Sequence, residues 1–143
     1  MELIESKVFS PFGDDIYRSV WSFDEDMDCA DLIELADKVL AVVGRDAKIT
    51  DISCIGDDGM DSHVPGNYWE FDSADAFVKE KSNMIDAFKD EDALSIDVSF
   101  KVDDGSGWLR IATERNSGEM MLSGSEKATD ALKPDIENEF ADR

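Results

Sequence analysis

Residues 94–123 read LSIDVSFKVDDGSGWLRIATERNSGEMMLS, and their pattern is the clearest indication of the fold. Over 94–102, apolar residues alternate with polar ones, which is typical of a strand with one buried and one wet face. Residues 103–107 have the composition of a hairpin loop, and a second turn falls at 115–118. The stretch therefore predicts a three-stranded meander.

Two further pairs of strands are expected upstream. Residues 3–9 and 16–23 are rich in apolar, β-branched and aromatic residues and flank a Ser-Pro-Phe-Gly turn, so they predict a hairpin. Residues 47–55 have apolar side chains on both faces, which is typical of a central strand. A Gly- and Asp-rich loop, 56–66, separates this strand from a short aromatic one at 68–71.

Three helices are expected, at about 29–43, 73–89 and 125–141. In the first helix, apolar residues recur at helical spacing, Asp28 is the expected N-cap, and Gly44 is expected to end the helix. In the last helix, Pro134 is expected to produce a kink or a restart. The order of elements predicts an α+β fold, one domain over 1–143, with a mixed or largely antiparallel sheet packed against the helices.

The composition excludes several functional classes. The 143 residues include 35 Asp and Glu against 14 Lys and Arg, which gives a net charge of −21. Such a surface repels nucleic-acid phosphates and anionic lipids, so we expect neither direct nucleic-acid binding nor membrane binding. No apolar run reaches the length of a membrane helix and no secretory signal is visible, so we expect a cytoplasmic protein.

Motifs for catalysis and metal binding are not found. The single histidine, His63, falls in the Gly- and Asp-rich loop, and the two cysteines show neither zinc spacing nor a disulfide framework. Acids alternate over 24–28 as in a calcium loop, but Cys29 and Leu35 stand where glycine and a bidentate glutamate are required. Phosphate-binding glycine motifs do not occur. We therefore expect no catalytic residue, no cofactor and no metal, which favours a non-enzyme.

The candidate contact residues are aromatic and charged. Trp108, Arg110 and Glu114 share one face of a strand, and a tryptophan, an arginine and a glutamate on a polar face are typical of a protein interface. The acid-rich loop around the histidine adds three carboxylates that would attract a cationic partner, those of Asp57, Asp58 and Asp61. Charge reversal there should slow association more than it speeds release.

The charge favours a binding module that antagonises a basic protein, such as an immunity protein that blocks a bacterial nuclease toxin. Two alternatives depend on the same charge. The protein could mimic DNA, although its acids are dispersed and interrupted by lysines, or its acidity could serve hydration in concentrated salt. A fourth reading is an enzyme with buried carboxylates of raised pKa, which a single sequence does not reveal.

Overall fold

A computed structural model of the chain describes residues 1–10, 13–23, 26–57, 68–114 and 116–140. Within these ranges the elements, in chain order, are β1 (Glu2–Phe9), β2 (Ile16–Ser22), α1 (Cys29–Asp46), β3 (Lys48–Asp57), β4 (Tyr68–Phe71), α2 (Ala74–Phe88), β5 (Ala93–Val102), β6 (Gly105–Glu114), β7 (Ser117–Gly124) and α3 (Glu126–Phe140). The predicted order of strands and helices is confirmed.

The strands form one seven-stranded sheet in the order β1-β2-β7-β6-β5-β3-β4. Every neighbouring pair is antiparallel. The α+β fold is thereby confirmed, with the predicted meander as β5, β6 and β7. The N-terminal hairpin joins the meander through the pairing of β2 with β7, and β3 lies inside the sheet, between β5 and the short edge strand β4.

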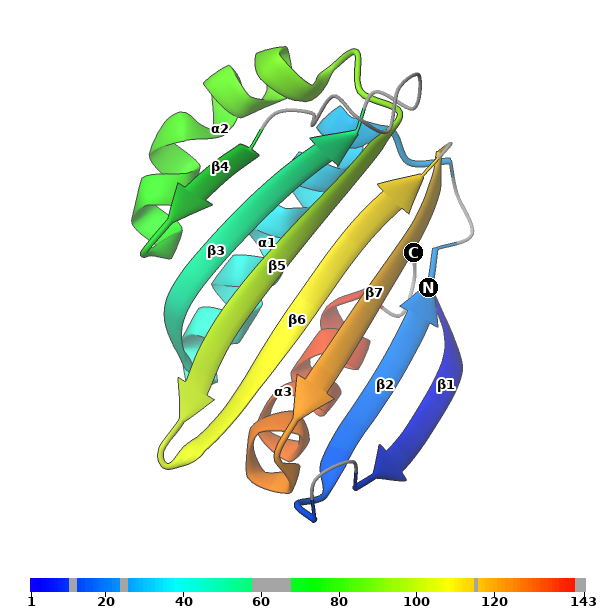
Figure 1. The fold of residues 1–143 in the computed structure, drawn as a ribbon, viewed down its shortest axis with the longest axis vertical. Coiled ribbons are helices and arrows are strands. Elements are labelled where there is room, and N and C mark those ends of the chain that lie inside the picture. Colours follow the sequence, from blue (N-terminus) through cyan, green and yellow to red (C-terminus); the bar gives the residue numbers. More distant parts are fainter. Residues whose placement is uncertain (11–12, 24–25, 58–67, 115, 141–143) are drawn as a thin grey trace.

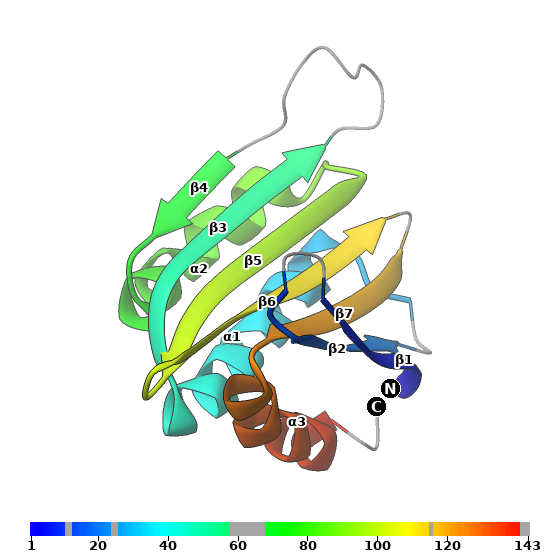
Figure 2. The same ribbon diagram turned by 60° about the horizontal axis from the view of Figure 1, so that its bottom comes forward.

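All three helices lie on one side of the sheet (Figure 1). Helix α1 packs behind β3, β5 and β6, α3 packs behind β2, β6 and β7, and α2 packs against α1 and the β3–β4 edge. Figure 2 shows the same separation from below, with the helices under the twisted sheet. Within the described part of the chain no element covers the opposite side, which we call the open face.

The alternation in β5 explains which side is buried. Leu94, Ile96, Val98 and Phe100 are each at most 1% exposed and face the helices, whereas Lys101 is exposed on the open face. Burial of four large apolar side chains from one strand removes much apolar surface from water, which is the main stabilising term in folding. The strand pattern thus orients the whole sheet relative to the helices.

Helix α1 is capped as expected but ends later than expected. The Asp28 side chain accepts from the backbone N–H of Asp31 at 2.8 Å, and the reciprocal bond completes a capping box. The prediction that Gly44 ends the helix is wrong, because α1 continues to Asp46. A glycine ends a helix by taking a left-handed conformation, which Gly44 does not take.

The predicted restart at Pro134 is also wrong, because α3 is continuous through this residue. A proline inside a helix removes the bond to the carbonyl four residues earlier, here that of Asp130, whose residue is exposed to water. Leu132, Ile136 and Phe140 are at most 2% exposed, so both halves of the helix are held by the core. Packing therefore outweighs the lost hydrogen bond.

Candidate functional site: the open face of the sheet

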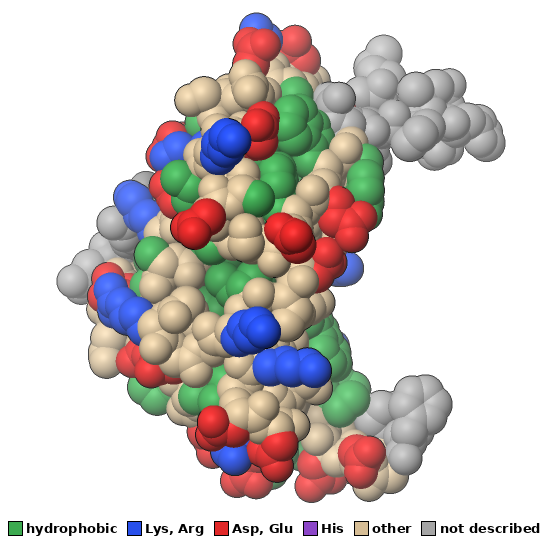
Figure 3. All heavy atoms as spheres, turned by 90° about the vertical axis from the view of Figure 1, so that its left-hand side faces the viewer, with side chains coloured by type: hydrophobic (Ala, Val, Ile, Leu, Met, Phe, Trp, Pro, Cys, Tyr) green, Lys and Arg blue, Asp and Glu red, His purple; other side chains and the backbone are tan. Residues whose placement is uncertain are grey.

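The open face is concave in profile. Figure 3 shows the molecule from the edge that carries β4 and α2, and the outline on the right, where the open face lies, curves inward. Val20 and Ser123 belong to this face by register and are only 5% and 1% exposed, so the middle of the face is closed to solvent at these two positions. A hollowed, uncovered face can receive a convex surface of another molecule.

The register of the strands arranges the side chains of the open face in rows. From β4 to β1, one row contains Tyr68, Ile55, Ser95, Ala112, Glu119, Ser22 and Glu2. The next row contains Glu70, Ser53, Asp97, Arg110, Met121, Val20 and Glu5. The third row, from β3 to β1, contains Asp51, Ser99, Trp108, Ser123, Arg18 and Lys7. Residues far apart in the sequence therefore become direct neighbours.

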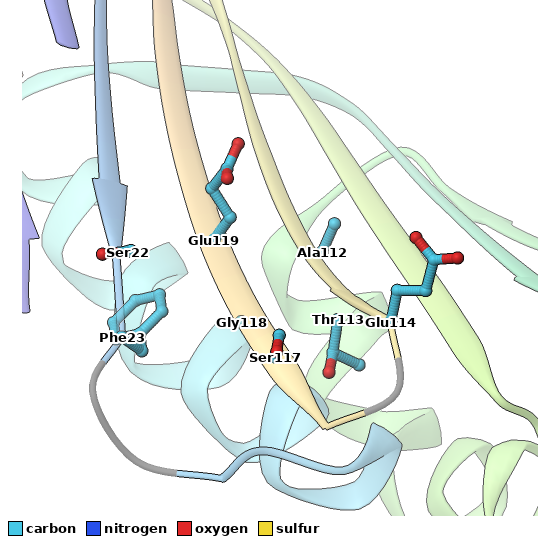
Figure 4. Close-up of a pocket in the computed structure, with 8 residues that line it drawn as sticks. All are labelled: Ser22, Phe23, Ala112, Thr113, Glu114, Ser117, Gly118 and Glu119. Carbon is cyan, nitrogen blue, oxygen red and sulfur yellow. The ribbon is translucent and has the colours of Figure 1, made fainter. Parts of the chain in front are cut away.

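One end of the open face is acidic. Glu2, Glu114 and Glu119 are exposed there, no Lys or Arg stands in the described rows that contain them, and we call these three residues the acidic end. Two of the three line a cavity of about 660 Å³, whose lining includes Glu114, Glu119 and the hydroxyl-bearing Ser22 and Ser117. Figure 4 shows the carboxylates of Glu114 and Glu119 extending from the neighbouring strands β6 and β7. Ser22 of β2 lies on the other side of Glu119.

The opposite end of the open face is basic. Lys48 lies directly across from Lys101, and Lys7 lies directly across from Arg18, with Asp51 as the acidic residue in the same rows. We call these four residues the basic end. Glu5 of the neighbouring row forms salt bridges with both Lys7 and Arg18, at 3.2 and 3.4 Å, whereas the like charges of Lys48 and Lys101 repel each other across their strands. The open face therefore carries a gradient of charge along its strands.

The predicted contact residues of β6 lie on the open face. Trp108 is 41% exposed, whereas Trp21 is 1% exposed and belongs to the core. From Trp108 to Glu114 the strand advances about 20 Å at about 3.3 Å per residue, so these residues extend along the face without forming one cluster. Arg110 is held by a neighbour, because its Nε donates to Asp97 Oδ1 at 2.7 Å.

The predicted loop carboxylates are only partly placed. Asp57 is the last residue of β3 and pairs in register with Ala93, which in turn pairs with Glu114. Its backbone therefore belongs to the same end of the sheet as the acidic end. Asp58 and Asp61 lie outside the described residues, as does His63.

Several residues of this face were not predicted as site residues. Glu2 and Glu119 join Glu114 only through strand pairing, and no local pattern marks them. Ile55 and Tyr68, which are 47% and 58% exposed, are direct cross-strand neighbours in the row of Glu119. The alternation of each strand shows which residues share a side, but the order of the strands decides which rows they form.

Thiol chemistry is disfavoured at both cysteines. Burial raises the pKa of Cys29 to about 11, with Asp28 adding to the shift, and burial raises the pKa of Cys54 to about 12, with Asp97 adding to it. Both thiols are therefore protonated at neutral pH, and a protonated thiol is a poor nucleophile and metal ligand. Among the described residues, no group of three or more His, Cys, Asp or Glu could hold a metal ion.

Comparison with known proteins adds no relative. No family model matches the chain, and neither a curated protein nor a solved structure matches it. In the described ranges, none of the three helices has the length and apolar character that crossing a membrane requires. The geometry and charge of the open face are therefore the features that bear on the function of this chain.

Proposed function

We propose that this protein is a non-catalytic binding module that antagonises a basic protein partner by covering the cationic site of that partner with the acidic end of its open face. One observation carries the proposal. Glu114 and Glu119 line a cavity, and Glu2 lies two strands away in the row of Glu119, without a described Lys or Arg in these rows, on a sheet face that no described element covers. An uncompensated group of carboxylates at a hollow fits a lysine or arginine side chain.

The cavity suits such a side chain chemically. Its carboxylates, from Glu114 and Glu119, can accept charge-assisted hydrogen bonds from an ammonium or guanidinium group, and the hydroxyl of Ser22 or Ser117 can accept a further bond. The hydroxyl of Thr113 also lies at the lining, but it already donates to the carbonyl oxygen of Met27. The ligand class that these groups favour is therefore a cation.

Exposed apolar side chains lie on the same open face as the acidic end, toward the edge strand β4. Ile55 and Tyr68 are exposed in the row that contains Glu119, and the Tyr68 hydroxyl donates to Glu70 at 2.9 Å. Buried aromatic and aliphatic anchors contribute most of the affinity of typical interfaces, whereas charges steer the approach and exclude wrong partners. The combination of anchors and carboxylates supports a protein as the partner.

The overall charge acts at longer range. A chain with a net charge of −21 attracts a cationic protein over about one Debye length, which is about 8 Å at physiological ionic strength. A nuclease is one partner of this chemistry, because its active site is cationic in order to hold phosphates. The finer proposal is therefore an immunity protein that blocks a nuclease toxin.

The test compares two variants that remove equal charge. Glu114→Gln with Glu119→Gln changes the acidic end, and Asp75→Asn with Asp130→Asn changes exposed positions on α2 and α3. Immobilised protein captures partners from the source cells, and calorimetry then measures the affinity of each captured protein at low and at physiological salt. We expect a basic partner whose affinity falls with salt. That affinity should fall at least about tenfold in the acidic-end variant and stay within about twofold in the control.

Two results would contradict the proposal. One is a captured partner that is acidic or binds independently of salt. The other is an equal loss of affinity in the acidic-end and helix variants, which would mean that only total charge matters. The finer proposal is tested by adding the protein to the captured partner in a nuclease assay, where inhibition is expected.

A different observation supports the alternative that the acidity of the protein serves hydration in concentrated salt. Residues 26–46, 72–92 and 126–140, which contain the helices and their flanks, carry 18 Asp and Glu against seven Lys and Arg. This excess lies on the side of the sheet opposite the acidic end, so it serves hydration better than it serves docking on the open face. A protein that requires concentrated salt to fold and captures no partner would support this alternative. The DNA mimic is favoured less, because the open face is acidic at one end and carries Lys48, Lys101, Arg18 and Lys7 at the other, so its carboxylates do not form an extended line.

A further inference from the structure

We propose that a second copy of this chain docks on the outer edge of β1, so that two sheets join through an antiparallel pair of β1 strands. The inference is independent of the proposed function. Strand β1 is the last strand on its side of the sheet, and no described element pairs with its outer edge. The unpaired backbone groups of such an edge form a template for another strand.

The edge is long and apolar. It has eight residues, whereas β4 at the other edge has four. Leu3, Ile4 and Val8 are 43%, 52% and 52% exposed, so one strand contains three of the seven exposed large hydrophobic residues of the described chain. Exposed apolar residues on a long edge strand are an aggregation hazard unless a partner covers them.

The sequence of β1 selects a second copy as that partner. Residues directly opposite in an antiparallel pair share a face, so two copies of β1 must be centred on a residue. Centring on Glu5 places two glutamates opposite each other, and centring on Lys7 places two lysines opposite each other. Centring on Ser6 places Glu5 opposite Lys7 of the second copy, twice, and Ile4 opposite Val8.

The geometry of β1 permits this register. Pairing with β2 is regular from Glu5 to Phe9, and the bulge falls between Leu3 and Glu5, at the end of the proposed contact. The central part of the contact therefore consists of regular strand, and the apolar side chains of Ile4 and Val8 border it.

Local charge favours approach at this edge. Strands β1 and β2 together contain two acids and two bases, so the paired strands are neutral in a chain with a net charge of −21, and the acids of this hairpin beyond them, Asp14 and Asp15, lie in its loop. Two copies repel each other least where their neutral surfaces meet. The negative charge on the rest of the surface opposes association of two copies, so association is most favourable at β1.

The test uses charge complementarity between two variants. Glu5→Lys alone, or Lys7→Glu alone, places like charges at both contacts of the pair, and each should weaken dimerisation at least about tenfold in sedimentation velocity. When the two variants are mixed in equal amounts, every contact again joins opposite charges, so a mixed dimer should form. Thermal unfolding shows that each variant folds.

Matched controls separate this register from an effect of total charge. Glu5 and Lys7 form an exposed ion pair at 3.2 Å, and Asp86→Lys and Lys89→Glu make the same charge changes in another one, at the C-terminal end of α2, with 3.1 Å between Lys89 Nζ and Asp86 Oδ1. These controls should dimerise like the natural sequence, and mixing them should change nothing. A natural sequence that stays monomeric at every concentration overturns the proposal, and so does a dimer that is insensitive to changes at Glu5 and Lys7.

Discussion

Replacement of Gly44 by alanine should stabilise the protein. Gly44 lies inside α1 at an exposed position, with helical backbone, and a Cβ added there meets no atom within 4 Å. Glycine inside a helix costs about 0.8–1.0 kcal/mol relative to alanine, because the unfolded chain loses more conformational freedom. Since no new contact offsets this gain, Gly44→Ala should raise the free energy of unfolding by about 1 kcal/mol and the melting temperature by about 4 °C.

The measurement is urea unfolding followed by circular dichroism, with Gly107→Ala as the contrasting variant. A Cβ at Gly107 would lie 2.7 Å from the Phe100 ring and 2.7 Å from the carbonyl oxygen of Ser123. We expect a loss of about 1–3 kcal/mol there, which is typical of overpacking in a core. A loss of stability in Gly44→Ala would refute the reasoning, because it would mean that Gly44 takes the left-handed conformation that ends a helix.

Three further predictions follow from burial and charge. At mildly alkaline pH, Cys29 should react with a thiol reagent about a hundredfold more slowly in the folded protein than in urea. The reason is that burial raises the pKa of its thiol from 9.0 to about 11, so less of it is thiolate, and mass spectrometry of the labelled protein measures the ratio of the two rates. A hydrogen bond to Asp46 raises the pKa of Asp135, so the folded state holds this proton more tightly than the unfolded state and stability falls as pH rises through the raised pKa. Asp135→Asn should therefore be more stable than the natural protein at neutral pH, and this advantage should disappear below the ordinary pKa of 3.8, as thermal unfolding across pH can show. Added salt should raise the melting temperature between low and physiological ionic strength, because it screens the repulsion within a chain of net charge −21, and an unchanged value would contradict this.

The local elements could be predicted because their signals lie within a few residues. The alternation from Leu94 to Val102 identifies β5 and its buried side, and Asp28 marks the start of α1 through a bond to Asp31 that spans three residues. The predicted helix end at Gly44 and the predicted restart at Pro134 were wrong for one reason. Residue preferences of about 1–3 kcal/mol predict a helix end, but burial of the apolar stripes on both sides of these residues keeps the helices continuous.

The candidate site depends on pairing that no local pattern encodes. Glu114 could be identified on a polar strand face, but Glu119 becomes its neighbour only because β7 pairs with β6, and Glu2 reaches the same end only because β1 pairs with β2 and β2 pairs with β7. Strands close into a sheet in the order that buries the most apolar surface under the helices, and this choice involves the whole chain. The amino-acid pattern therefore predicts strands, helices and the sign of the charge, whereas the tertiary structure decides which face stays uncovered and which carboxylates meet there.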